Sequence, residues 1–165
     1  MQITSWSAAW FLPFVLPICA WVTWSDLSAM RIPNKSVLLL TLVFLVIGLF
    51  VIPIWPDYPI RLLGLVIMLI VGMVANAIGL MGAGDSKFIA AAAPFVAPGD
   101  ASLIAYIFGI NLLACFITHR VVMRTGLRNM APEWVSWHRP KKFPMGFSLA
   151  ATLVIYLGLG IRFGA

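Results

Sequence analysis

The chain has 165 residues, of which 62% are hydrophobic and 10% charged, with a mean hydropathy of +1.04 and a net charge of +6. Soluble domains are roughly 45–50% apolar and about 25% charged, so this composition excludes a soluble globular fold. The positive charge is explained by basic residues that hold loops at the cytoplasmic face of a membrane, so nucleic acid is not an expected partner. The length allows one compact bundle, and we expect a single membrane-embedded domain over residues 1–165.

Six apolar runs follow one another along the chain. A bilayer core needs about 20 apolar residues per helix, with a range of roughly 17–25. The fourth run reaches this length only if the preceding segment Gly82–Lys87 lies partly at membrane depth. The predicted spans are Ala8–Trp24, Val37–Ile54, Leu62–Met81, Phe88–Ala97, Ala101–Thr118 and Met145–Phe163. The sequence therefore predicts an all-α, polytopic membrane helical bundle of about six transmembrane helices.

Basic residues are strongly asymmetric if all six runs cross the membrane. One side then carries Arg31, Lys35, Lys87, Arg120, Arg124, Arg128, Arg139, Lys141 and Lys142, and the other only Arg61 and Arg162. The positive-inside rule makes the first side cytoplasmic. We therefore expect a multi-pass protein of the cytoplasmic (inner) membrane with both termini outside the cytoplasm.

The connection between the last two runs, His119–Phe143, is basic and rich in aromatic residues. We interpret His119 and His138 as solvated residues of this loop, because they lack the spacing of metal ligands. Within it, Ala131–Lys142 is compatible with a short helix on the membrane surface or with an ordinary basic loop.

The two cysteines, Cys19 and Cys115, both lie inside apolar runs. This position indicates buried or lipid-facing residues and gives neither a disulfide framework nor a cysteine-ligated zinc module. No metal or other cofactor is expected.

Only five acidic residues occur, and two of them, Asp26 and Asp85, stand at helix ends on the predicted cytoplasmic side. Because an ionisable residue at membrane depth is costly, it indicates function. The alternative is that each carboxylate only marks where a helix leaves the bilayer. Of the others, Asp57 and Asp100 fall in short loops on the outer side, where neutralising them should leave activity intact.

Two carboxylates that converge in a site can share one proton, because like charges a few ångströms apart resist joint ionisation. The ionised member takes a proton from water as the water attacks a carbonyl, and the protonated member donates to the carbonyl oxygen. Asp85 also follows Gly82-Ala83-Gly84. Glycines permit unusual backbone conformations and close approach of another chain, which suits an extended substrate beside a carboxylate.

Three stretches carry a family resemblance: Ser25-Asp26-Leu27 through Arg31-Ile32-Pro33-Asn34, then Met81 through Phe88, and Phe143 through Phe147. With Gly-x-Gly-Asp some 50–60 residues after the first aspartate, the chain resembles the membrane aspartic prepilin peptidases. The resemblance implies that Asp26 and Asp85 form a catalytic dyad at the cytoplasmic face. It also implies that small prepilins or pseudopilins are the substrates.

Two departures from the family pattern refine this resemblance. The chain starts almost directly with a helix and lacks the N-terminal module with paired cysteines that methylates pilins in larger members. It is therefore similar to the short, peptidase-only members of tight-adherence (Flp) pilus systems. Met145 also stands where an aromatic residue is common, and we assign Phe143–Phe147 to packing or site shaping.

Further residues beside the aspartates are expected to bind substrate or shape the site: Gly82, Gly84, Lys87, Arg31 and Asn34. Lys87 could hold Asp85 ionised or meet an acidic residue of the substrate. The Lys87 side chain could instead extend to the membrane interface and fix the topology of the chain. Arg31 allows the same two interpretations. Asn34, after Pro33, is expected to shape the turn that follows the first helix.

Three other functions stay open on these residues. Asp26 and Asp85 could bind cations in a small proton-coupled transporter, although matching interrupted helices are lacking. A non-catalytic scaffold leaves the Gly-Ala-Gly-Asp segment unexplained. Peptidase action on archaeal preflagellin-type precursors is not distinguished from prepilin cleavage. The oligomeric state stays open.

Overall fold

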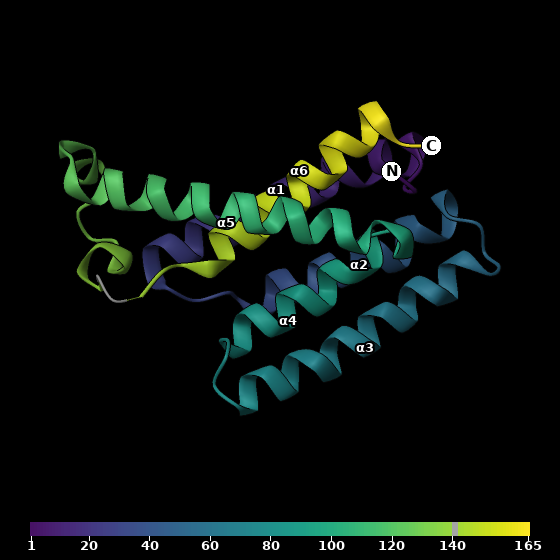
Figure 1. The fold of residues 1–165 in the computed structure, drawn as a ribbon, viewed down its shortest axis with the longest axis horizontal. Coiled ribbons are helices and arrows are strands. Elements are labelled where there is room, and N and C mark those ends of the chain that lie inside the picture. The colour runs from purple at the N-terminus through teal and green to yellow at the C-terminus, as the bar shows by residue number, and fades with distance from the viewer. Residues whose placement is uncertain (140–141) are drawn as a thin grey trace.

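A computed structural model of the chain describes residues 1–139 and 142–165. The described residues form six α-helices and four short 3-10 helices (Figure 1). The α-helices are α1 (Ser5–Ala29), α2 (Asn34–Val51), α3 (Asp57–Ala77), α4 (Ala83–Ala92), α5 (Ala101–Arg124) and α6 (Met145–Phe163). The 3-10 helices are η1 (Ala93–Phe95), η2 (Pro98–Asp100), η3 (Gly126–Met130) and η4 (Val135–His138). The predicted all-α bundle is confirmed.

Five segments are long and apolar enough to cross a bilayer, namely α1, α2, α3, α6 and the stretch Pro98–Arg124 that contains α5. Large apolar side chains on their outer surfaces are exposed, including Phe50, Tyr106 and Ile110. Exposed apolar surface on this scale requires lipid as the surrounding solvent. The chain is a multi-pass membrane protein.

The short helix α4 has 10 residues, a length of about 15 Å, and is not among the segments able to span alone. The chain nevertheless continues through η1 and η2 to the opposite end of the bundle, where α5 begins (Figure 1). There the Arg61 guanidinium of α3 donates to the carbonyls of Pro94 and Phe95, both at 3.4 Å. A short helix and two 3-10 turns thus replace one long helix.

The core lies between α1, α2, α6 and the segment that follows α4. Helix α1 packs most extensively against α6. Phe11, Phe44 and Phe95 are fully buried and meet ring to ring, with centroids 4.9 Å apart for Phe11–Phe95 and 5.4 Å for Phe44–Phe95. This apolar centre separates two polar ends.

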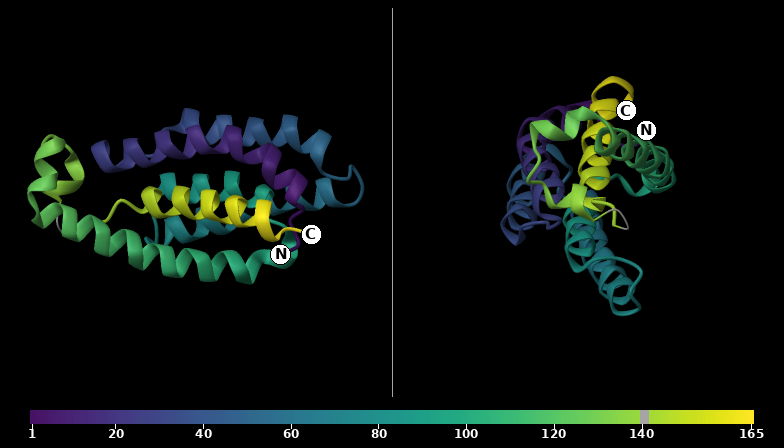
Figure 2. Two further views of the ribbon diagram at one scale, coloured as in Figure 1. Left: turned by 90° about the horizontal axis from the view of Figure 1, so that it is seen from above. Right: turned by 90° about the vertical axis from the view of Figure 1, so that its left-hand side faces the viewer.

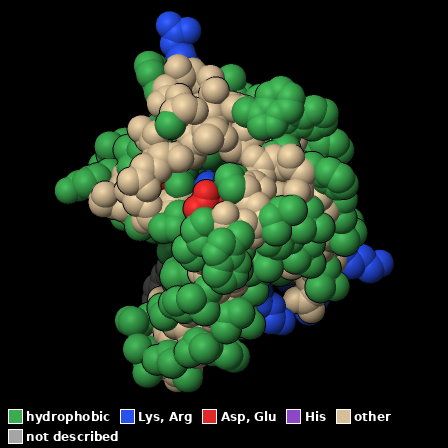
Figure 3. All heavy atoms as spheres, turned by 90° about the vertical axis from the view of Figure 1, so that its right-hand side faces the viewer, with side chains coloured by type: hydrophobic (Ala, Val, Ile, Leu, Met, Phe, Trp, Pro, Cys, Tyr) green, Lys and Arg blue, Asp and Glu red, His purple; other side chains and the backbone are tan. Residues whose placement is uncertain are grey.

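We call one of these the termini end, because the first and last residues meet there (Figures 1 and 2). The N–H of Ala165 donates to the carbonyl of Ile3 at 3.0 Å, and the N–H of Ser5 donates to the carbonyl of Ala165 at 3.3 Å. In a view of this end, hydrophobic side chains surround acidic atoms near the middle of the face (Figure 3).

Asp100 belongs to the termini end but is not a solvated loop acid, since only 4% of its surface is exposed. Its carboxylate accepts the N–H groups of Gln2 at 2.8 Å and Ile3 at 3.0 Å, and the hydroxyl of Tyr156 at 2.8 Å. The residue therefore holds the start of the chain, η2 and α6 together.

At the opposite end, α5 continues to Arg124, followed by the segment that we call the basic loop, residues 125–144. His119 consequently lies inside a helix and is buried at 2% exposure, so its interpretation as a solvated loop residue is wrong. His138 is exposed. Of the two alternatives for Ala131–Lys142, the described part contains only the four-residue turn η4, and Lys141 lies outside the described residues.

Candidate active site

Asp26 lies in the last turn of α1. The helix ends because Met30 adopts the left-handed conformation, with φ 52° and ψ 47°, while its N–H closes on the carbonyl of Asp26 at 2.9 Å. Pro33 then disfavours helical geometry for Ile32, so the chain turns back before α2 begins. The Ser25 hydroxyl fixes this turn by donating to the carbonyl of Arg31 at 2.8 Å.

Asp85 lies in the first turn of α4. Gly79, at φ +78°, ends α3 in a conformation that favours glycine, and Gly82 is the N-cap of α4. The Asp85 carboxylate turns back toward the N–H of Gly82. A Cβ on Gly82 would lie 2.9 Å from Asp85 Oδ2, so glycine leaves room for this conformation. A carboxylate is favourable here because the helix N-terminus carries partial positive charge.

Ile32 is the residue around which the three sequence stretches meet. A Cβ on Gly84 would lie 3.3 Å from Ile32 Cβ, and a Cβ on Gly146 would lie 2.9 Å from Ile32 Cδ1. Glycine at both positions lets α4 and α6 close on the turn after α1. The carboxylates of Asp26 and Asp85 are thereby near enough for direct charge interaction.

The Asp26 carboxylate is buried against the start of α6. The residue is only 5% exposed, and the first turn of α6 faces it with the N–H groups of Gly146 and Phe147. Even so, Oδ2 has no hydrogen-bond partner among the described residues. A buried carboxylate oxygen without a partner costs folding free energy, and such atoms are rare unless they serve chemistry.

The other predicted site residues lie in the segments next to Asp26 and Asp85. The Lys87 ammonium donates to Asn34 Oδ1 at 3.2 Å and so joins the first turn of α4 to that of α2. Gly84 is packed inside the first turn of α4 against Ile32, while Gly82 borders the Asp85 carboxylate. Arg31 is exposed and contributes its carbonyl to the turn.

Gly146 is the site residue that sequence reasoning did not single out. A Cβ there would lie 2.9 Å from Asp26 Oδ2, so only glycine admits the carboxylate against α6 without a shift. The available signal was a glycine just inside the predicted start of the last helix, within the stretch already assigned to packing or site shaping.

A chain of aromatic rings holds the basic loop against the ends of α1 and α5. Trp24, two residues before Asp26, meets Trp134 edge to face with centroids 5.1 Å apart, and Trp134 stacks on Trp137 at 5.6 Å. Trp137 stacks on buried His119 at 4.8 Å, and His119 meets Phe143 at 5.9 Å. We call these residues the ring chain. It joins α1 to α5 and ends at Phe143, three residues before Gly146.

Fold and site together define a multi-pass helical membrane protein with two interacting carboxylates at one end of its bundle. The model of the Type IV leader peptidase family matches residues 13–122, about two thirds of the chain. The chain belongs to this family. The matched range includes Asp26 and Asp85 and ends before Gly146. No curated protein and no solved structure matches the chain.

Proposed function

We propose that this leader peptidase is an aspartic endopeptidase that removes the leader from small, type IV-like (Flp-type) prepilins or pseudopilins. The observation that carries the proposal is the convergence of Asp26 and Asp85 on one site, with the Asp26 carboxylate buried and incompletely hydrogen-bonded. Family membership supports peptidase chemistry over the transporter and the scaffold.

In the proposed mechanism the two carboxylates share one proton. The ionised carboxylate takes a proton from water as the water attacks the carbonyl carbon of the leader junction, and the protonated carboxyl donates to the carbonyl oxygen, which gives a tetrahedral diol. The C–N bond then breaks as the first carboxyl passes its new proton to the leaving amine and the second carboxylate takes a proton back from the diol, which restores the single shared proton. The N–H groups of Gly146 and Phe147 stabilise Asp26 in the part of the cycle in which its carboxylate is ionised. The residues at hand complete this cycle with water alone, so the proposal needs no cofactor.

We further propose that the aspartate end, meaning the end of the bundle with Asp26, Asp85 and the basic loop, faces the cytoplasm. The basic residues described at this end are Arg31, Lys35, Lys87, Arg120, Arg124, Arg128, Arg139 and Lys142. The termini end carries Arg61 and Arg162. This asymmetry follows the positive-inside rule for a protein of the inner membrane with both termini outside.

The test is cleavage of a purified Flp-type prepilin precursor by Asp26→Asn and Asp85→Asn variants. Each carboxamide keeps the shape of the side chain but cannot exchange the proton, so we expect turnover to fall by at least roughly 10²–10⁴-fold with membrane insertion unchanged. Asp57→Asn is the matched control, because Asp57 is exposed in the first turn of α3. Parent-level cleavage by either dyad variant would contradict the shared-proton mechanism.

A further inference from the structure

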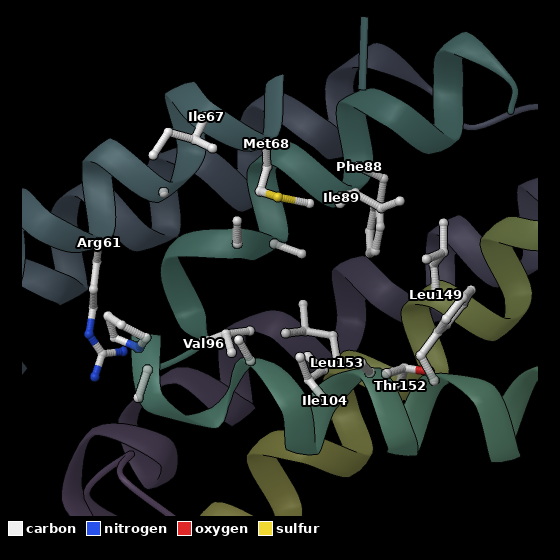
Figure 4. Close-up of a pocket in the computed structure, with 18 of the residues that line it drawn as sticks. Arg61, Ile67, Met68, Phe88, Ile89, Val96, Ile104, Leu149, Thr152 and Leu153 are labelled. Carbon is white, nitrogen blue, oxygen red and sulfur yellow. The ribbon is translucent and has the colours of Figure 1, made fainter. Parts of the chain in front are cut away.

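A second feature of the molecule is an apolar groove beside the site. A cavity of about 550 Å³ lies between α3, α4, α5 and α6 (Figure 4). Ile60, Leu63 and Ile67 of α3 line it and are also 46%, 57% and 49% exposed, so the cavity opens toward lipid. We call it the lateral groove. Its lining is almost entirely apolar apart from Arg61, and the Thr152 hydroxyl in it already donates to the carbonyl of Ser148 at 2.7 Å.

Two helices, α4 and α6, carry residues of the lateral groove one turn after residues of the site. On α4, Phe88, Ile89 and Ala92 line it, three, four and seven residues after Asp85. Residues at this spacing share one helix face, so the carboxylate and the groove lining lie on the same side of α4.

Helix α6 also carries groove-lining residues one turn after a residue of the site. Leu149 and Leu153 line the groove, three and seven residues after Gly146, the glycine that touches Asp26. The groove therefore begins one helical turn beyond the site and runs from there toward the termini end, where Arg61 lies (Figure 4).

We propose that the lateral groove binds an apolar helix of the substrate, placed so that the chain leaves the helix at the two aspartates. This inference rests on the proposed function. A substrate segment inside the bilayer must be helical, because its backbone polar groups find no partners in lipid, and it must be extended where it is cleaved. A groove along α4 whose lining begins one helical turn from Asp85 meets both requirements.

The walls of the groove also fit a helix better than a lipid chain. Small residues, which let helix backbones approach closely in membranes, stand in the wall at Gly64, Ala92, Ala101 and Ala105. A Cβ on Gly64 would have nothing within 4 Å, so the space above this glycine is open. An acyl chain would match the apolar walls, but it would give no reason for their alignment with the aspartates.

The first experiment fills the groove with Gly64→Leu. The control is Gly158→Leu in α6, because a Cβ on Gly158 also has nothing within 4 Å and the residue is exposed away from the groove. Kinetics are measured on a Flp-type prepilin precursor and on a soluble peptide with the leader junction but without the apolar helix. We expect Gly64→Leu to raise KM for the precursor about tenfold and to leave cleavage of the peptide unchanged.

The second experiment detects binding without cleavage. Ala105→Cys in the groove is expected to form a disulfide with a cysteine in the apolar helix of the precursor, and Gly64→Leu should abolish it. Ile110→Cys, on the same helix and 73% exposed outside the groove, is the control. Cys19 and Cys115 are buried and do not compete.

The outcomes separate this inference from the proposed function. Crosslinking through Ala105→Cys without cleavage would support the groove and refute the peptidase mechanism. Normal cleavage with no crosslink and parent kinetics for Gly64→Leu would refute the groove and leave the mechanism standing. A phospholipid retained by the parent and lost from Gly64→Leu in native mass spectrometry, with no crosslink, would assign the groove to lipid and overturn the inference.

Discussion

Asp26 is held at its backbone and at its carboxylate by two different segments. The N–H of Met30 closes α1 on its backbone carbonyl, and Gly146 of α6 approaches its Oδ2. The carboxylate therefore has little room to move toward α6. A general acid or base works efficiently only when it is held in reach of the reacting atoms, and these contacts provide that restriction.

Gly146→Ala tests this restriction directly. A Cβ would lie 2.9 Å from Asp26 Oδ2 and 2.9 Å from Ile32 Cδ1, so the carboxylate or the isoleucine must move. We expect turnover to fall about tenfold or more, while the free energy of unfolding decreases by about 1–3 kcal/mol, the usual cost of overpacking.

The control for this variant is Gly109→Ala on α5, where a Cβ has nothing within 4 Å. There we expect parent turnover and a small gain in stability, because alanine favours the helix over glycine by up to about 1 kcal/mol. Turnover and thermal unfolding in the same detergent are the measurements. Parent-level turnover of Gly146→Ala would show that α6 does not position Asp26.

The sequence predicts the two aspartates and the turn between α1 and α2 because their signals are local. The sequence has only five acidic residues, a proline directly after Ile32 and two glycines just before Asp85. Gly146 escapes such reasoning because its role comes from a contact with Asp26, 120 residues earlier in the chain. His119 was misjudged for the same reason: its partners Trp137 and Phe143 lie in a later segment of the chain.

At the scale of elements, hydropathy predicts every α-helix but places several helix ends at the wrong residues. Helix α1 extends to Ala29 and α5 to Arg124, beyond the predicted limits at Trp24 and Thr118, because their polar last turns leave the apolar layer. Helix α4 begins at Ala83 where Phe88 was predicted, since its first turn is capped by Gly82 and carries the polar site residues. Helices α2 and α3 instead end at Val51 and Ala77, before the predicted limits at Ile54 and Met81, because Pro53 and the left-handed Gly79 follow them. Apolar composition alone therefore does not fix where a helix ends.

Asp100, the last residue of η2, is the basis for a prediction about stability. The Asp100 carboxylate accepts hydrogen bonds from two backbone N–H groups and from the Tyr156 hydroxyl. In the asparagine variant one of the two oxygens is replaced by an NH2 group, which would face these donors with donors of its own. We expect thermal stability in detergent to fall by about 1–3 kcal/mol, with normal cleavage by the folded fraction at low temperature. Asp57→Asn should leave stability unchanged, and an equally stable Asp100→Asn variant would show that the network is unimportant.

At the scale of the whole molecule, the two polar ends differ in charge and in construction. The termini end is sealed by hydrogen bonds between the first and last residues and around Asp100, while the aspartate end contains the site and the long basic loop (Figure 2). The lateral groove connects the two along α4. The proposed site therefore lies at the end of the bundle opposite the one that the termini close.

The orientation is tested by labelling single cysteines with a membrane-impermeant maleimide. Leu127→Cys in η3 and Trp55→Cys in the connection between α2 and α3 are suitable, because these residues are 57% and 81% exposed. We expect Trp55→Cys to react in intact cells and Leu127→Cys only after the inner membrane is opened. Reaction of Leu127→Cys in intact cells would place the basic loop outside and refute the proposed topology.

The ring chain has a spectroscopic consequence. Trp24, Trp134 and Trp137 are neighbours within 5.1 and 5.6 Å, so their electronic transitions couple, and His119 stacks at 4.8 Å on the last of them. Near-ultraviolet circular dichroism arises from such fixed aromatic packing and disappears when the packing is lost. Release of the basic loop from α1 would therefore change the signal of the unmodified protein, which carries its own optical reporter at the aspartate end.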